Sequence, residues 1–274
     1  MAGVLLALGV GLAAGATAGT YVLALAGLVL IAVAPVRPPD QRQRPPGAWH
    51  AELGLGLTVL WRDRLLRRLT LLTAAMNVAW AFWTALFVLY AVAPGPLGLT
   101  PPQYGLLLSL VAVGGLLAAP AVDPLARRLG VRTVLILDLV GTALLVAPPA
   151  MGLDLLPVAA GAVVAGAGST VWRAVVATIR QNRVPSHVLG RVYSASRIIS
   201  WGVLPIGAAA AGVMASSLGV RAALGAASVL AVVLIALFAA LMKDHDLDRD
   251  YVGSPPRDPA PPARTTAVKE AAPR

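Results

Sequence analysis

Six long apolar runs separated by short connections dominate most of this sequence. An α-helix rises ~1.5 Å per residue, so about 20 apolar residues are needed to cross the ~30 Å hydrocarbon core of a bilayer. Each run reaches or approaches that length. We therefore predict an all-α, polytopic transmembrane helix bundle. Its spans are expected at about Leu69–Val92, Tyr104–Val122, Thr133–Ala147, Leu156–Ile179, Val192–Ser216 and Ala222–Met242. The third span is short, and we expect its true ends to lie in its flanks.

The composition favours the lipid bilayer as the main solvent. Of the 274 residues, 58% are hydrophobic and only 12% are charged, whereas a soluble domain usually has about 25% charged residues. There is no cysteine, which excludes a disulfide scaffold, a thiolate metal site and a cysteine nucleophile. The formal net charge of +10 suggests nucleic-acid binding, but most arginines lie in the short connections. We therefore expect no nucleic-acid partner.

The arginines alternate regularly between the connections. The first, third and fifth connections of the six spans contain only Arg221, whereas the preceding linker and the second and fourth connections contain thirteen arginines. Positive residues are enriched on the cytoplasmic side of membrane proteins. The pattern predicts an integral multi-pass protein of the plasma (inner) membrane. Its linker and C-terminus are expected in the cytoplasm, and residue 1 outside.

The first 34 residues contain a further apolar run, Val4–Ala34, which is too long for one upright helix. Its glycines Gly11, Gly15 and Gly19 recur every four residues, a spacing that lets another helix approach closely. No positive charge precedes the run, so it does not fit a signal peptide. We interpret it as the end of one membrane helix, a turn near residues 14–20, and then a spanning helix. One long tilted helix is the alternative.

Residues 35–68 are predicted to form a cytoplasmic linker that includes an amphipathic helix. Apolar residues at helical spacing indicate a helix on the membrane surface from Trp49 to Asp63. A polybasic lipid-binding switch formed with the arginines that follow is the alternative. Residues 243–274 are charged and rich in proline, which predicts a disordered cytoplasmic tail. We interpret His245 and its acidic neighbours as part of this solvated run and expect no metal site.

Three segments resemble the major facilitator superfamily of transporters, and in particular its branch of drug, macrolide and siderophore exporters. Residues 51–69 (AELGLGLTVLWRDRLLRRL) are similar to the segment that leads into the seventh helix of that family. Residues 180–212, with the motifs R-V-P-x-x-x-x-G-R-V and W-G-x-x-P-x-G, resemble the loop between helices ten and eleven and the helix after it. Residues 123–132 (DPLARRLGVR) resemble the second copy of the family's basic loop. Pro124 and Ala126 replace the more familiar Gly and Asp there.

The resemblance implies that residues 69–242 are the second six-helix bundle of a twelve-helix transporter. Residues 1–34 would be the end of the first bundle, with about one spanning helix. Transporters of this family work by rocking two bundles about a site near the membrane midplane. We therefore consider three accounts: a truncated gene or pseudogene, a split transporter with a separate N-terminal half, or a half-size transporter that pairs with a second copy.

The resemblance also implies a function, namely efflux of small amphipathic compounds such as drugs by an antiporter that uses the proton gradient and no bound cofactor. An enzyme is not expected, because the sequence has no GxSxG elbow, HExxH motif, P-loop or Rossmann glycine pattern. A non-transporting membrane scaffold or binding module, or an inactive fragment that keeps the bundle, is the alternative.

Four polar residues lie inside the predicted spans, where an unpaired charge is costly and marks a functional candidate. Asp138 and Arg197 both lie ~8 Å from the inner ends of their spans, which predicts an intramembrane charge pair that simply holds the bundle or that binds protons through Asp138. Arg173 and Asn77 lie slightly deeper, on helices that resemble the cavity-lining tenth and seventh helices. We expect them to face the transport pathway, with Arg173 attracting an anionic substrate or a carboxylate of the missing half.

Two further groups are candidates for transport. Trp80 and Trp83 belong to the most aromatic of the six spans, and aromatic walls suit bulky apolar or cationic drugs. Helix packing and lipid contact are the alternative uses of these rings. Gly202, Pro205 and Gly207 give the fifth span a flexible, closely packed point at which a gating helix would bend.

Overall fold

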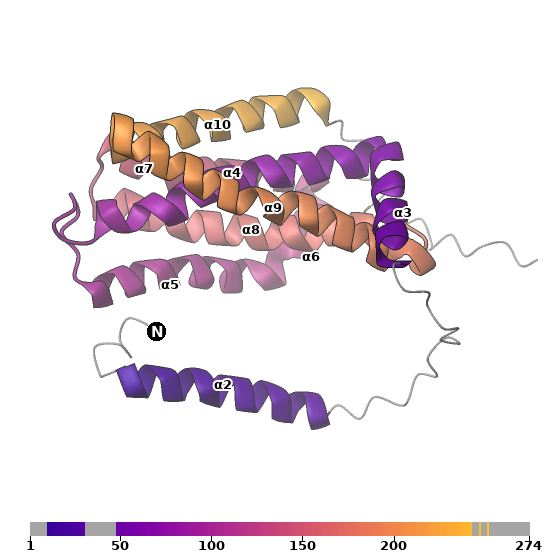
Figure 1. Cartoon of the computed structure of the whole chain (residues 1–274), viewed down its shortest axis with the longest axis horizontal. Helices are drawn as coiled ribbons and strands as arrows, with labels where there is room; N and C mark the ends of the chain where they lie inside the picture. The colour runs from indigo at the N-terminus through magenta and orange to yellow at the C-terminus, as the bar shows by residue number, and fades with distance from the viewer. Residues whose placement is uncertain (1–9, 31–47, 243–246, 248–250, 252–274) are drawn as a thin grey trace, which may run out of the picture.

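The computed structural model describes residues 10–30, 48–242, 247 and 251, and the elements in this part of the chain are helices. Figure 1 shows their arrangement. The elements are α2 (Val10–Leu30), α3 (Ala48–Arg62), α4 (Arg64–Ala91), α5 (Pro101–Ala118), the short 3-10 helix η1 (Ala119–Ala121), α6 (Val122–Leu129), α7 (Val131–Met151), α8 (Leu155–Arg183), α9 (Ser186–Leu218) and α10 (Val220–Leu241).

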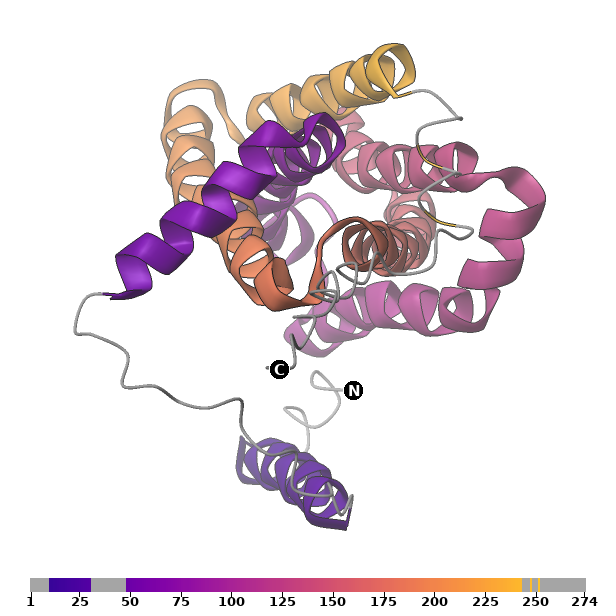
Figure 2. The same cartoon turned by 90° about the vertical axis from the view of Figure 1, so that its right-hand side faces the viewer.

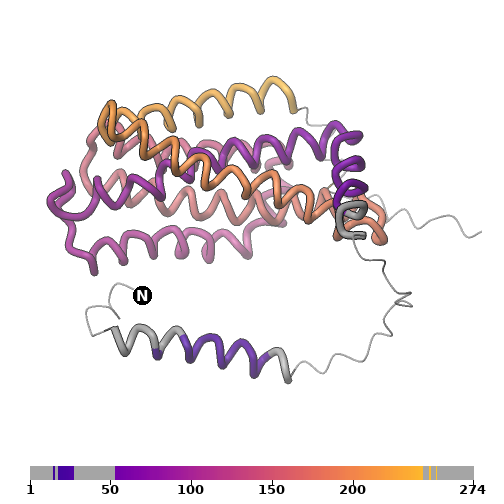
Figure 3. The backbone as a smooth tube through the Cα atoms, in the orientation of Figure 1, coloured from indigo at the N-terminus to yellow at the C-terminus, as the bar shows by residue number. Residues whose placement is uncertain are grey.

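Six stretches of the described chain are long and apolar enough to cross a membrane, which confirms the predicted all-α fold and its six spans. They run side by side in an antiparallel bundle (Figures 1 and 3). Five of them are single helices, and one combines α5, η1 and α6. The stretches are Arg64–Ala91, Pro101–Leu129, Val131–Met151, Leu155–Arg183, Ser186–Leu218 and Val220–Leu241.

The basic connection before the fifth span is shorter than predicted. The sequence pattern favoured a polar loop from Arg180 to Arg191, but α8 continues to Arg183 and α9 begins at Ser186. Pro185 ends the connection because its carbonyl accepts hydrogen bonds from the amides of Val188 and Leu189 and so begins the next helix. The third span extends into both flanks, as expected, and α7 runs from Val131 to Met151.

Helix α2 is continuous through residues 14–20, so the predicted turn in this region is wrong and the single-helix alternative holds for the described part. Tyr21, Leu23 and Leu25 on α2 are 62–74% exposed and do not pack on the bundle. The predictions for residues 1–9, for the proline-rich part of the linker, and for His245 and nearly all of the tail lie outside the described residues.

The bundle is built around α8, which packs against α7 on one side and α5 on another. Three glycines of α8 make these contacts possible. A Cβ at Gly161 would overlap the backbone of Leu144 on α7, and a Cβ at Gly166 would overlap the backbone of Val111 on α5. Gly168 lies against Asp138 of α7 in the same way. Lipid tails give no hydrophobic drive for helix association, so this close backbone approach is a main source of packing energy.

A second pair of helices, α4 and α9, packs beside this group, and α10 closes the bundle against α7 and α4 (Figure 2). Two apolar clusters fill the interior. One surrounds Leu135, Trp172 and Phe238, and the other surrounds Phe87 and Tyr90 farther along α4. Apolar side chains therefore fill much of the interior of the bundle.

Helix α3 crosses one end of the bundle at a steep angle to the spanning helices (Figure 1). We call this the basic end. It is formed by α3, the start of α4, α6, the end of α8 and the start of α9, and it carries most of the arginines of the described chain. Leu60 of α3 is fully buried among Leu66, Val184 and Val192. A Cβ at Gly56 would overlap the backbone of Arg191 on α9.

The corner between α3 and α4 is fixed by Asp63. Its Oδ1 accepts hydrogen bonds from the amides of Leu65 and Leu66 and so caps α4, at 2.9 and 3.1 Å. Its Oδ2 pairs with the Arg183 guanidinium at the end of α8. Arg67 Nη1 donates to the carbonyl of Trp61 at 2.9 Å. One carboxylate thus connects the linker helix, the first span and the fourth span.

The glycine contact between α8 and α5 gives a direct test of the packing. Gly166→Ala should lower the free energy of unfolding by about 1–3 kcal/mol, because the new methyl must push the two backbones apart. Gly212→Ala on α9 is the matched control, since nothing lies within 4 Å of its Cβ position. Thermal unfolding in detergent measures both. Equal stability of the two variants would contradict the close approach.

Candidate functional site

A row of polar contacts connects α4, α8 and α9 inside the bundle. Thr70 Oγ1 on α4 and Ser196 Oγ on α9 lie 3.1 Å apart, and Ser200 Oγ donates to the carbonyl of Thr70 at 3.4 Å. One turn deeper, the Asn77 side-chain amide donates to the carbonyl of Ser200. We call Thr70, Asn77, Arg180, Ser196 and Ser200 the polar seam. It fastens α9 to α4 along two turns from the basic end.

Arg180 contributes the charge of the polar seam. It is only 8% exposed, its Nη2 donates to Ser196 Oγ at 2.9 Å, and its guanidinium lies 4.5 Å from the ring centre of Tyr193. Its Nε is buried and has no hydrogen-bond partner. Because Ser196 accepts from Arg180, its own hydroxyl proton is available for Thr70. The arginine therefore orients a hydroxyl chain that links three helices.

Only Asn77 of the polar seam was singled out from the sequence, and it contacts α9 rather than standing free in a pathway. The sequence does contain a signal for Thr70, Ser196 and Ser200. Thr70 and Asn77 are seven residues apart on α4, and Ser196 and Ser200 are four apart on α9, so each pair shares a helix face. Arg180 gave no such signal because it was interpreted as part of a loop.

Asp138 is the most deeply buried charged residue of the spans, at 1% exposure. It lies at the contact between α7 and α8, where a Cβ at Gly168 would come 2.7 Å from its Oδ1. This oxygen has no hydrogen-bond partner. Glycine at position 168 therefore leaves the volume that the carboxyl group occupies.

The predicted ion pair between Asp138 and Arg197 is not formed in the structure. Arg197 is exposed on α9, and its guanidinium lies 4.9 Å from the ring centre of Trp201 on the same helix. The two residues share a depth, but α7 packs against α8 and α10, whereas α9 packs mainly against α4 and α3. The cation that acts electrostatically on Asp138 is instead Arg173, on the neighbouring helix α8.

Arg173 itself is exposed, and it donates hydrogen bonds to its own helix. Nε donates to the carbonyl of Ser169 at 3.1 Å, and Nη2 lies 3.4 Å from Ser169 Oγ. These bonds hold the guanidinium along α8 without neutralising its charge. Arg173 thus remains available to an anionic group that approaches the exposed face of α8.

The aromatic residues of α4 are mainly core residues. Trp83 is 4% exposed and stacks on Phe87 with ring centres 4.6 Å apart. Trp80 is half-buried and meets Trp83 edge to face at 5.6 Å. Trp83 Nε1 is buried without an acceptor. Helix packing is therefore the role these contacts support, and Trp80 is the ring of the two that is partly accessible.

The proposed gating point on α9 lies in an unbroken helix. α9 runs from Ser186 to Leu218 through Pro205. Gly202 has open space around it, whereas a Cβ at Gly207 would lie 2.9 Å from the Cβ of Ala81 on α4. The helix is therefore closely packed at Gly207 and uncovered at Gly202, and it continues through Pro205 without a break.

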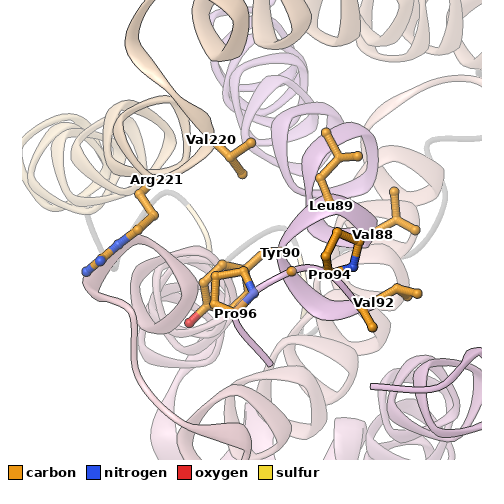
Figure 4. Close-up of a pocket in the computed structure, with 10 residues that line it drawn as sticks. Val88, Leu89, Tyr90, Val92, Pro94, Pro96, Val220 and Arg221 are labelled. Atoms are coloured by element: carbon orange, nitrogen blue, oxygen red, sulfur yellow. The ribbon is translucent and has the colours of Figure 1, made fainter. Parts of the chain in front are cut away.

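A cavity of about 500 Å³ lies at the opposite end of the bundle (Figure 4). None of the residues predicted from the sequence lines it. Tyr90 and Arg221 at its margin are used structurally, because Tyr90 donates to the carbonyl of Leu153 and Arg221 donates to the carbonyl of Met151. Its lining is Val88, Leu89, Tyr90, Val92, Ala93, Pro94, Gly95, Pro96, Val220 and Arg221.

Two spans leave most of their apolar surface uncovered. In the most apolar window of Pro101–Leu129 only 11% of the residues are buried, and in that of α9 only 17%, against 56% in α7. Hydrophobic residues such as Leu116 and Leu117 on α5 and Ile206 on α9 are 68–75% exposed. Arg173 on α8 and Arg197 on α9 are exposed as well. We call the exposed surface of α5, α8 and α9 the uncovered side of the bundle.

The six apolar helices and their glycine-mediated packing define an integral, multi-pass membrane protein. Residues 79–273 match the Major Facilitator Superfamily, so the chain belongs to this family of membrane transporters. No curated protein and no solved structure matches the chain.

A double-mutant cycle tests the arrangement of the intramembrane charges. Combining Asp138→Asn with Arg197→Gln should give additive changes in stability, within about 0.5 kcal/mol, because these side chains do not meet. Asp138→Asn with Arg173→Gln should deviate from additivity, because Arg173 acts on the carboxylate. Thermal unfolding of the single and double variants in detergent measures both cycles. Strong coupling between Asp138 and Arg197 would contradict the structure and support the ion pair predicted from the sequence.

Proposed function

We propose that this chain is the second-half bundle of an exporter that moves small amphipathic compounds, such as drugs, out of the cell in exchange for protons. The observation that carries the proposal is the uncovered side of α5, α8 and α9. A bundle that acted only as a packed membrane anchor would have no use for exposed intramembrane arginines, because each is costly in lipid. Facing a second bundle across a wet pathway, the same arginines are solvated.

The orientation follows from charge. Arginines concentrate at the basic end, whereas Arg221 is the arginine of the described connections at the opposite end. We therefore place the basic end, with α3, in the cytoplasm of the producing cell. The second bundle would be a separate N-terminal half or a second copy of this chain, and α2 would belong with it.

The pathway side offers two kinds of recognition. Arg173 presents a cation that forms no salt bridge with an acidic side chain within the described residues, although Asp138 is its electrostatic neighbour. On α9, Trp201 is 54% exposed and carries the Arg197 guanidinium over its ring. A flat apolar surface next to a positive charge suits amphipathic molecules with an aromatic part. Trp80 of α4 is half-buried and offers a second aromatic ring that is partly accessible.

Proton coupling requires a group that changes its charge. Asp138 is the carboxylate available in the six described spanning helices, apart from Asp123 of the polar α6. It is buried with one oxygen unpartnered and has Arg173 as its electrostatic neighbour. Protonation of Asp138 would therefore change the field at Arg173, which connects the proton site with the substrate side of α8.

The proposal is tested in inverted membrane vesicles of the native host, in which any separate first half is present. Accumulation of a fluorescent amphipathic dye with a negatively charged group is followed after a proton gradient is imposed. Deletion of this chain should lower gradient-driven accumulation about tenfold. Replacement by Asp138→Asn should lower it to the same level, because the amide of Asn cannot take up and release a proton. Arg128→Gln, at an exposed position of α6, is the control and should retain accumulation.

Unchanged accumulation of a panel of amphipathic dyes after deletion would contradict export. Loss of the Asp138→Asn protein from the membrane would instead assign Asp138 a structural role, so membrane abundance is measured in parallel.

A further inference from the structure

We propose that the outer surface of α3, together with the start of α4, binds the headgroups of anionic phospholipids. The surface consists of Leu57, Trp61, Arg62 and Arg64, and we call it the α3 surface. The inference goes beyond export and stands independently of it. It rests on how α3 divides its side chains between the bundle and its surroundings.

Helix α3 has apolar residues on two faces, and only one of these faces is buried against the bundle. Leu60 and Gly56 face α9 and are buried. Leu57 and Trp61, which are four residues apart and so share a flank, remain 44% and 46% exposed. Packing against α9 explains the burial of the first pair and leaves the second pair only about half covered. A tryptophan next to a leucine on a surface helix is typical of the membrane interface.

The position of α3 places this flank at the level of lipid headgroups. The helix lies across the ends of the spanning helices rather than along them (Figures 1 and 2). α4, which spans the membrane, begins two residues after α3 ends. The corner is held by Asp63, which caps α4 and pairs with Arg183. The linker helix therefore cannot swing away from the membrane surface without breaking this pair.

Arginine charge around this corner lacks a protein counter-ion. Arg62 and Arg64 are exposed and pair with no acidic side chain within the described residues. Asp63 is already paired with Arg183. Arg64 lies in the first turn of α4, where the helix dipole disfavours a cation, so an anion close to it would relieve an unfavourable arrangement. Arg62, in the last turn of α3, is a second exposed cation two residues away. Anionic phospholipids supply phosphates at this depth, and nearby arginines attract them.

The absence of cysteine from the chain permits a site-directed test. A cysteine introduced by Leu57→Cys is labelled with a fluorophore, and the full chain is reconstituted in phosphatidylcholine vesicles that contain phosphatidylglycerol. Bromine atoms, which quench fluorescence on contact, are placed either on the phosphatidylglycerol or on an equal amount of the phosphatidylcholine. Brominated phosphatidylglycerol should quench at least about threefold more strongly, as expected for two nearby arginines.

The matched variants separate local binding from net charge. Arg62→Gln with Arg64→Gln should bring the quenching ratio close to one. Arg127→Gln with Arg128→Gln removes the same charge from exposed positions of α6, also at the basic end, and should leave the ratio unchanged. Equal quenching by both lipids in the unaltered chain would overturn the proposal. So would a fluorophore shielded from both lipids, because the α3 surface would then be covered by protein.

Discussion

The glycine-lined surface of α8 is the contact on which the rest of the structure depends. Inside a bilayer the backbone hydrogen bonds of each helix are satisfied locally, and lipid competes equally with apolar side chains for a neighbour's surface. Helices then associate through close van der Waals contact. Gly161 and Gly166 bring α7 and α5 to the backbone of α8, and Gly114 of α5 and Gly141 of α7 do the same from the other side. Methyl groups at these positions would open the bundle.

The same close approach creates the most unusual site of the bundle. Because position 168 is glycine, the Asp138 carboxyl group fits between α7 and α8. A carboxyl group held there senses Arg173 on α8, which carries its charge to the uncovered side of the bundle. The glycines of α8 therefore allow both the close packing of the helices and the burial of the candidate proton site, Asp138. The polar seam and Asp63 provide a second connection, from α3 through α4 and α8 to α9.

The sequence predicted the features that depend only on position along a helix, such as where each span lies and how deep a residue is in the membrane. The length and hydropathy of the apolar runs placed six spans, and arginine-rich connections marked the basic end. Rotation about a helix axis was not predictable in this way. Asp138 and Arg197 share a depth, but they lie on helices that pack against different neighbours. Thr70, Ser196 and Ser200 were missed for a related reason. Hydroxyl residues in membrane helices often bond to their own backbone, and only the tertiary contact between α4 and α9 makes these three a network.

In the proposed exporter the basic end is cytoplasmic and the exposed arginines belong to a pathway between two bundles. Both features depend on the orientation of the six spans. The cysteine-free chain allows single cysteines to report on it. Leu129→Cys lies at the basic end, and Leu153→Cys lies in the turn at the opposite end, both at exposed positions. A membrane-impermeant maleimide applied to intact cells should label position 153 and reach position 129 only after lysis. Labelling of position 129 in intact cells would contradict the account.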